Sequence, residues 1–152
     1  FRFDMQDIGA RLTGGLIPGS PISRSSQDGG KEVVLIRSPN GHFEASASIN
    51  GQNVRFLIDT GASGIVLSAA DAERAGMDVD KLSYTIITQT ANGSGRAADA
   101  RIDSLRIGSI ERRNVRVSVV QRGKLRQSLL GQDFLESLSS YEKRGDRLTL
   151  RD

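Results

Sequence analysis

Short alternations of apolar and polar residues, each ended by turn-forming residues, run through most of this chain. Residues 43–49 alternate with a period of two, as expected for a strand that buries one face. Asn50 and Gly51 follow, and because both accept a positive φ they predict a tight hairpin turn. The return strand is predicted over 54–58, which delivers Asp59 at its carboxyl end.

Further short strands and a pair of short helices are predicted along the rest of the chain. An alanine-rich helix is predicted over 68–75, because Ser68 and Asp71 form a capping-box-like start and Gly76 suits its C-terminal end. Another short helix is predicted over 133–138. Many short strands, few helices and frequent turns predict an all-β, barrel-like domain. The other predicted strands cover 33–36, 65–67, 84–90, 96–108, 115–119, 129–131, 141–143 and 148–150.

The first 30 residues differ from the rest in composition. Segment 14–30 is dominated by Gly, Ser and Pro, and such a composition buries too little apolar surface to offset the entropy of ordering it. We therefore predict a flexible linker or tether over residues 1–30 and one folded domain over residues 31–152. The chain begins at Phe1 rather than Met, so we also expect that a targeting or anchoring segment can precede it.

Composition narrows the classes of function. The 152 residues include 21 basic and 18 acidic ones, five Phe, two Tyr and no Trp, so the chain lacks the charge excess and the stacking platforms of a nucleic-acid-binding domain. With no cysteine and with His42 as the single histidine, we expect no thiol chemistry, no metal site and no cofactor. A basic cluster over 112–126 indicates a solvated face; the alternative is a patch for acidic partners or lipid headgroups.

Residues 56–64 read Phe-Leu-Ile-Asp-Thr-Gly-Ala-Ser-Gly and place an acid between two apolar strands. A carboxylate is costly in such surroundings, so it is retained where it is fully hydrogen-bonded or where its chemistry is used. Gly61 lets the chain turn tightly and exposes backbone N–H groups beside Asp59. The same turn has a purely structural interpretation, since Asp and Gly are common turn residues.

Three features, in this order, resemble the retropepsin-like aspartic proteases: the loop Asp59-Thr60-Gly61-Ala62, a hairpin tip at Asn92-Gly93-Ser94-Gly95, and Leu129-Leu130-Gly131 before a short helix. The likeness covers about residues 31–152 and is to the bacterial single-domain, membrane-anchored periplasmic members. It implies a closed acid-protease barrel with one or two short helices. It also implies a place in the bacterial periplasm or cell envelope, with a membrane tether upstream that is absent from this chain.

The resemblance assigns roles to these residues. Asp59 matches the catalytic acid, Thr60 the threonine that bonds to the partner's loop, and Gly61 a residue whose backbone contacts substrate. Residues 92–95 match the flap that closes over substrate, and residues 129–131 match the strand that supports the loop and lines pockets. Gln132 departs from the arginine that commonly braces the dimer in viral relatives, and a C-terminal hairpin replaces their single strand.

Peptide hydrolysis in this family needs two carboxylates, one to take a proton from water and a protonated one to donate to the carbonyl oxygen. One Asp-Thr-Gly string occurs here, so the resemblance implies a symmetric homodimer that pairs Asp59 with its copy, binds peptide in extended form and works at acidic pH. The expected function is that of an aspartic endopeptidase. The alternative is a non-catalytic peptide-binding or dimerisation module on the same barrel.

Overall fold

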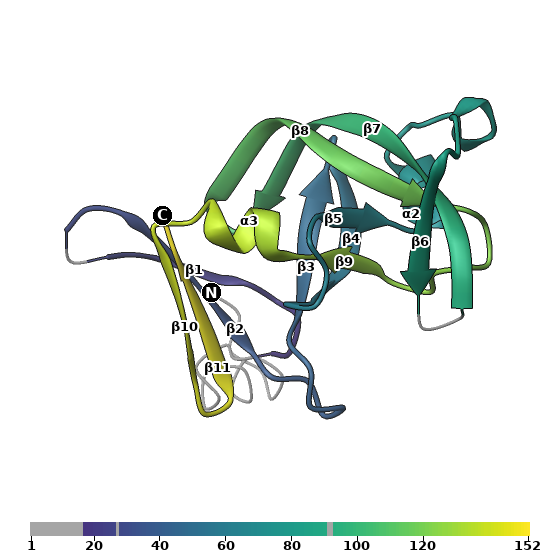
Figure 1. Ribbon diagram of the computed structural model, residues 1–152. Helices are drawn as coiled ribbons and strands as arrows, with labels where there is room; N and C mark the ends of the chain where they lie inside the picture. Colours follow the sequence, from purple (N-terminus) through teal and green to yellow (C-terminus); the bar gives the residue numbers. More distant parts are fainter. Residues whose placement is uncertain (1–16, 27, 91–92) are drawn as a thin grey trace, which may run out of the picture.

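The computed structural model describes residues 17–26, 28–90 and 93–152 of the chain. These residues form two β-sheets with two short α-helices, which confirms the prediction of an all-β fold with few helices (Figure 1). The strands are β1 (Ile22–Ser25), β2 (Lys31–Ile36), β3 (Glu44–Ile49), β4 (Gln52–Ile58), β5 (Ile65–Leu67), β6 (Ile86–Thr90), β7 (Gly93–Ile107), β8 (Ile110–Val120), β9 (Ser128–Leu130), β10 (Ser140–Arg144) and β11 (Arg147–Arg151).

The larger sheet closes into a barrel. Its strand order is β3-β4-β9-β5-β8-β7-β6, and β3 also pairs with β7, so that six of its seven strands form a closed ring. The barrel encloses the main core, in which Phe56, Leu67, Leu105 and Leu130 are almost completely buried. The smaller sheet has the order β1-β2-β11-β10 and contains the predicted C-terminal hairpin (Figure 1).

The β3–β4 hairpin, which carries the candidate acid, forms as the alternation predicts. Strand β3 alternates half-buried and buried side chains, and Asn50 and Gly51 have φ values of 51° and 84° at the turn. The Asn50 side chain also fixes this turn, because its oxygen accepts hydrogen bonds from the backbone N–H groups of Asp103 (2.8 Å) and Ser104 (3.2 Å) on β7. Asn50 therefore supplies both the turn conformation and hydrogen bonds to the adjacent strand β7, where the barrel closes.

The helices lie near the predicted positions. Helix α2 (Ala69–Arg74) begins at Ser68, whose side chain accepts the backbone N–H of Asp71 at 3.1 Å. Helix α3 (Gln132–Glu136) follows β9, and a 3₁₀ turn, η1 (Val79–Lys81), follows α2. No helix in the described part of the chain is both long and apolar enough to span a membrane.

The segment predicted as a linker contains a strand that the composition did not predict. Strand β1 pairs antiparallel with β2, with Ile22 opposite Val34. Strand β2 buries nearly its whole length, so it needs hydrogen-bonding neighbours on both edges, and β1 and β11 supply them. Residues 1–16 lie outside the described residues, so a tether there, and the boundary at residue 31, stay predictions.

Residues 93–95 of the predicted glycine tip at 92–95 are paired as strand. Strand β7 already begins at Gly93, and the residues from Gly93 to Gly95 pair with Thr90 back to Thr88 on β6. Asn92 lies outside the described residues. Strand pairing continues through these small residues because β6 supplies a backbone partner for each, which local composition does not reveal.

Candidate active site

The loop that carries Asp59 leaves β4 and returns as β5 on the other side of β9. Strand β9 pairs parallel with β4 and antiparallel with β5, so Leu130 lies opposite Ile58 on one side and Ile65 on the other. The backbone N–H of Asp59 donates to the carbonyl of Leu130 at 3.1 Å. Strand β9 thus holds both stems of the loop.

The start of α3 fixes the rest of this loop. The first N–H groups of a helix have no partner within it, and here they donate to loop carbonyls. These backbone hydrogen bonds run from Gly131 to Gly64 (3.1 Å), from Gln132 to Ala62 (2.9 Å) and from Asp133 to Ser63 (2.7 Å). In addition, the Gln132 side-chain amide donates to the carbonyl of Thr60 at 3.2 Å, so Gln132 fixes the loop of its own chain.

Gly131 is required by this close packing. A Cβ atom at Gly131 would lie 2.5 Å from the carbonyl oxygen of Gly64 and closer still to that of Ala62. Such contacts are with backbone atoms, so a side chain here would displace the loop. Gly131 therefore supports the loop through its lack of a side chain, and its neighbour Leu130 supports it through its carbonyl while its own side chain is fully buried in the core.

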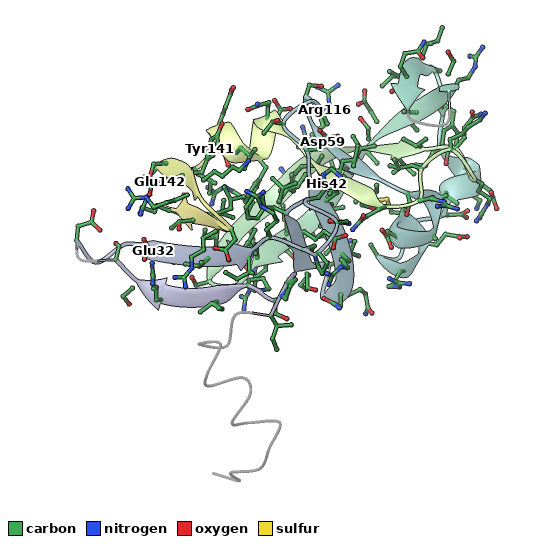
Figure 2. The ribbon with its side chains drawn as sticks, turned by 90° about the horizontal axis from the view of Figure 1, so that it is seen from below. Glu32, His42, Asp59, Arg116, Tyr141 and Glu142 are labelled. Atoms are coloured by element: carbon green, nitrogen blue, oxygen red, sulfur yellow. The ribbon has the colours of Figure 1, made fainter. Side chains whose placement is uncertain are left out.

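The Asp59 carboxylate is half-buried and keeps most of its hydrogen-bonding capacity. Its Oδ1 accepts the backbone N–H of Gly61 at 2.9 Å, and it makes no ion pair within the residues that the structure describes. Thr60 and Gly61 beside it are exposed. Figure 2 shows Asp59 well apart from Glu32 and Glu142 of the smaller sheet. The loop therefore holds the acid in place, and no basic side chain among the described residues pairs with it.

A cleft of about 510 Å³ opens beside Asp59, between the loop, strand β6 and the segment that precedes β9. Leu129 lines it together with Asp59, Gly61 and Ala62. Neither Leu130 nor the residues 93–95 are among its lining residues. The other lining residues are Leu57, Ser63, Val66, Thr88, Gln89, Val120, Lys124, Leu125, Arg126 and Gln127, and nothing in the sequence pattern pointed to residues 124–127 as part of the site.

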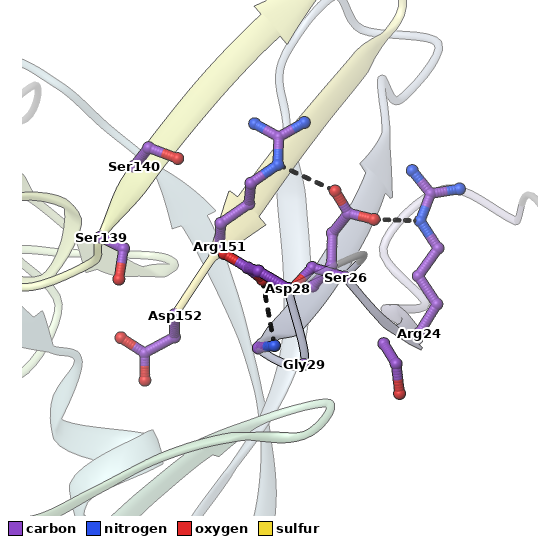
Figure 3. Close-up of a pocket in the computed structure, with 11 residues that line it drawn as sticks. Arg24, Ser26, Asp28, Gly29, Ser139, Ser140, Arg151 and Asp152 are labelled. Carbon is purple, nitrogen blue, oxygen red and sulfur yellow. Dashed lines mark hydrogen bonds and ion pairs between the residues drawn. The ribbon is translucent and has the colours of Figure 1, made fainter.

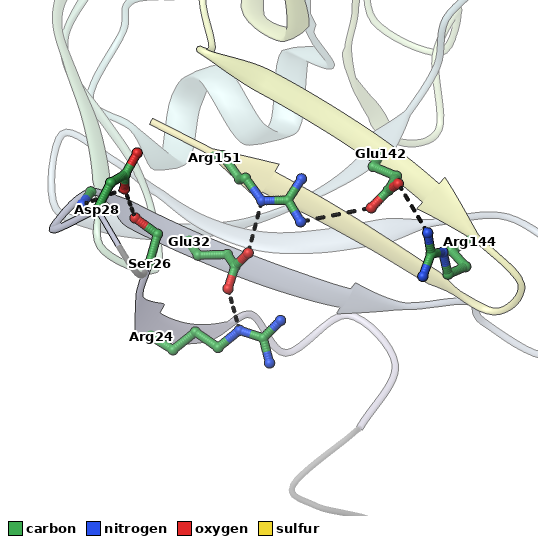
Figure 4. Close-up of polar contacts among 8 residues, drawn as sticks. Arg24, Ser26, Asp28, Glu32, Glu142, Arg144 and Arg151 are labelled. Atoms are coloured by element: carbon green, nitrogen blue, oxygen red, sulfur yellow. Dashed lines mark hydrogen bonds and ion pairs between the residues drawn. The ribbon is translucent and has the colours of Figure 1, made fainter.

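A second hollow, of about 920 Å³, lies on the smaller sheet (Figure 3). Most of its charged side chains already have partners: Glu32 accepts from Arg24 and from Arg151 (2.9 Å), and Arg151 also approaches Glu142 at 3.7 Å (Figure 4). Asp152 pairs with Arg112 at 2.8 Å, and Asp28 accepts hydrogen bonds from Ser26 and from the backbone N–H of Gly30. The hydrogen bond from Arg24, and then that from Arg151, lower the pKa of Glu32. These pairs stabilise the sheet, so the cleft beside Asp59 remains the candidate site. The described residues contain no cluster of potential metal ligands.

Comparisons with known proteins agree with this geometry. A family described as "gag-polyprotein putative aspartyl protease" matches residues 45–137. The crystal structure of a retropepsin-like aspartic protease from Rickettsia conorii superimposes with a TM-score of 0.73 at 34% identity, covering 87% of this chain and 95% of that one. EIAV protease, in complex with an inhibitor, superimposes with a TM-score of 0.57 at 17% identity, covering 72% of this chain and 100% of that one. At this identity the comparison shows a similarity of fold alone.

Similar sequences occur in longer bacterial proteins. An uncharacterized protein of Sinorhizobium sp is 43% identical over 152 residues, which are 100% of this chain and 65% of that protein. An uncharacterized protein of Rickettsia prowazekii (strain Madrid E) is 37% identical over 150 residues, 99% of this chain and 62% of that protein. The chain thus spans somewhat less than two thirds of the length of these relatives.

Proposed function

Because the chain belongs to the retropepsin-like aspartic protease family, we propose that it is an aspartic endopeptidase that acts as a homodimer. The observation that carries the proposal is the environment of the Asp59 carboxylate. It is half-buried, accepts the backbone N–H of Gly61, has no ion pair among the described residues and lines a cleft of about 510 Å³. Asp59 is also the one acid among the residues that line this cleft. Chemistry that needs two carboxylates must therefore obtain the second from another copy.

The proposed dimer is symmetric, so that each chain presents the same loop to the other. Thr60 and Gly61 are exposed at the loop, which leaves this surface available for a copy of itself. Two carboxylates about 3 Å apart do not both ionise readily, so one is kept protonated and the other ionised at mildly acidic pH. The resulting pKa values belong to the pair and not to either copy of Asp59.

In the proposed reaction, the ionised Asp59 takes a proton from water, and the water oxygen attacks the carbonyl carbon of the peptide bond. The protonated carboxyl, the partner's Asp59, donates its proton to the carbonyl oxygen. The tetrahedral intermediate then collapses: the Asp59 that took the proton from water passes it to the leaving nitrogen as the C–N bond breaks. The partner's Asp59 takes a proton back from a hydroxyl of the intermediate, which leaves a carboxylic acid and restores the starting protonation of the pair. Rigid placement matters because misaligned groups lose much of their catalytic effect, and the bonds from Gly61, Leu130 and the α3 terminus provide it.

The substrate proposed for this site is a peptide in extended form. Strand β6 is the last strand of the larger sheet, so one of its edges has no strand partner among the described residues. Thr88 and Gln89 of this strand line the cleft. An extended peptide can add to such an edge through main-chain hydrogen bonds, with its side chains directed alternately into the cleft and away from it.

Cleavage of a denatured protein between about pH 3 and pH 7 tests the proposal, because a dyad that must be half protonated works in this range. We expect the parent chain to cleave, with a maximum at acidic pH, and Asp59→Asn to be inactive. Asp103→Asn, at an exposed acid on β7, is the matched control and should retain activity. Cleavage that persists undiminished in Asp59→Asn would rule out the mechanism. A chain that binds peptide but never cleaves would be the non-catalytic module.

The place of the protein in the cell is a separate proposal. We propose that it is held in the periplasm or cell envelope by a segment outside this chain, as the resemblance implies. Fractionation of cells that express the complete protein tests this. Recovery with the membrane, and release of the domain by a protease added to permeabilised outer membranes, is the expected result; recovery with the cytosol would contradict it.

A further inference from the structure

The segment 121–127, which joins β8 to β9, forms one wall of the cleft beside Asp59 and is fixed near both ends. At its start, Gln121 donates through its backbone N–H to the Arg96 carbonyl (3.1 Å), and its side chain accepts the Arg96 N–H (3.2 Å). At its end, the Gln127 amide donates to Glu44 at 2.8 Å. We refer to this segment as the cleft wall.

The cleft wall carries three cations, and they differ in their partners. Arg122 forms a bidentate pair with Glu73, at 2.8 Å and 2.6 Å, and lies 3.7 Å from Asp80. Lys124 and Arg126 line the cleft and have no carboxylate within 4.0 Å among the described residues. Two positive charges therefore line the same cleft as Asp59 without an ion pair to any described residue.

The surroundings of these cations favour pairing with an incoming acid. Lys124 is half-buried, and its aliphatic stem packs against Gly95 of β7. A Cβ atom added to Gly95 would lie 3.4 Å from Cγ and 3.6 Å from Cδ of Lys124. Apolar side chains around the cleft strengthen the attraction between opposite charges there, although Arg126 itself is exposed. The apolar lining residues are Leu57, Ala62, Val66, Val120, Leu125 and Leu129.

We propose, resting on the peptidase function above, that this cleft selects peptides in which an acidic side chain lies close to a bulky apolar one. The apolar residue is buried against the lining, and the carboxylate is bound by Lys124 and Arg126. Asp59 repels an acid at the reacting centre, which directs the acidic residue toward the cleft wall. Lys124 and Arg126 are thus specificity-determining residues for the proposed reaction.

A pair of peptides that differ only in Glu or Gln beside the apolar residue tests this selectivity. At about pH 5.5 the parent chain should cleave the Glu peptide about five-fold better in kcat/KM, the size expected of an exposed ion pair. The ratio should fall toward one below about pH 4.3, where the peptide carboxyl becomes neutral. The titratable groups facing the bound acid are Asp59, Lys124 and Arg126, while Glu44, Glu73 and Asp80 behind the wall are held by Gln127 and Arg122.

Variants of the cleft wall identify the residues responsible. Lys124→Gln and Arg126→Gln should each lower the Glu/Gln ratio, and the double variant should bring it close to one. Lys81→Gln removes the same charge from a site outside the cleft and should leave the ratio unchanged. Arg126→Glu should reverse the preference toward a Lys peptide, a gain that misfolding cannot produce. An unchanged ratio in the double variant would overturn the proposal.

Peptide binding to Asp59→Asn separates this inference from the proposed function. Suppose that the parent does not cleave, but that the parent and Asp59→Asn both bind the Glu peptide about five-fold more tightly than the Gln peptide in fluorescence anisotropy. The selectivity then stands and the peptidase mechanism fails. If cleavage depends on Asp59 but Glu and Gln peptides are cut and bound equally, the mechanism stands and the selectivity fails. Equal or absent binding together with absent cleavage overturns both.

Discussion

Around Asp59, two glycines lie where a side chain would press on oxygen atoms. A Cβ atom on Gly61 would be 3.2 Å from the Asp59 Oδ1 that its own N–H holds. At Gly131 the neighbours are backbone carbonyls of the loop, which cannot rotate away. The position of Asp59 therefore depends on the lack of a side chain at Gly61 and Gly131 as much as on hydrogen bonds.

Replacing Gly131 by alanine should displace the loop. Overpacking against backbone costs about 1–3 kcal/mol, so we expect a loss of that size in the free energy of unfolding in urea, together with loss of cleavage. Gly64→Ala is the matched control: its Cβ would make an ordinary contact of 3.5 Å with the Asp133 side chain, and stability should change little. Equal stability of the two variants would show that the loop relaxes freely around Gly131.

The sequence predicted some of these residues and not others, for a physical reason. Asp59 and Gly61 stand out because an acid between apolar strands, next to a turn residue, is visible locally. In the sequence, Gln132 stands out only as a departure from the arginine that commonly braces the dimer in viral relatives. In the structure its side-chain amide donates to the carbonyl of Thr60 in the same chain. The sequence indicates solvated charges at Lys124 and Arg126, because only the folded chain brings them to the same cleft as Asp59.

Among the elements, strands with their own alternation and turn signals were predictable. The β3–β4 hairpin follows from Asn50 and Gly51, and the C-terminal hairpin of β10 and β11 was found in the same way. Strand β1 was missed because three of its four residues are polar and its strand partner, β2, is not visible in its local sequence. Likewise, the start of β7 at Gly93 depends on its partner β6 and not on its own composition.

Helix α2 and strand β9 are joined by a buried hydroxyl, which gives an element-scale prediction. Ser128 is fully buried; its Oγ donates to Asp71 at 2.6 Å and accepts the backbone N–H of Ser68 at 3.0 Å. Ser128→Ala leaves both groups without this partner, so the free energy of unfolding should fall by about 1–3 kcal/mol.

The control for this variant is Ser118→Ala on strand β8 of the same sheet. Ser118 is half-buried and makes no side-chain hydrogen bond among the described residues, so denaturant unfolding should detect little change. If Ser128→Ala unfolds at the same urea concentration as Ser118→Ala, the hydroxyl does not join the two elements.

At the scale of the whole molecule, several carboxylates that stabilise the fold have lowered pKa values, which favours stability at mildly acidic pH. The pKa values of Glu32, Glu44 and Asp152 are all lowered, mainly by hydrogen bonds from Arg24, Gln127 and Arg112, respectively. A lowered pKa means that the stability these groups provide is complete above their unfolded-state pKa, about 4 for Asp and Glu, and is lost as the pH falls through the folded-state value. The fold should therefore keep its ion pairs at the mildly acidic pH that an aspartyl dyad requires.

Glu32→Gln tests this pH dependence. At pH 6 the variant should melt at a lower temperature than the parent, because Arg24 and Arg151 lose a shared anionic partner. The difference in Tm should begin to shrink as the pH falls below the unfolded-state pKa of a glutamate, about 4.3, and should disappear only below the lowered folded-state pKa of Glu32. Glu136→Gln, at an exposed glutamate with no ion pair among the described residues, controls for the loss of one charge. A Tm difference that stays constant from pH 7 to 3 would contradict the assignment.

The central claim is that one active site takes an Asp59 from each of two chains, and subunit mixing tests it most directly. Increasing amounts of Asp59→Asn are added to a fixed concentration of the parent chain after brief acid dissociation, and peptide cleavage is measured. Because mixed dimers would hold a single catalytic carboxylate, activity should fall progressively, to about half at equal amounts when dimers are tight. Activity that stays constant as the variant is added would show that each chain hydrolyses peptides alone.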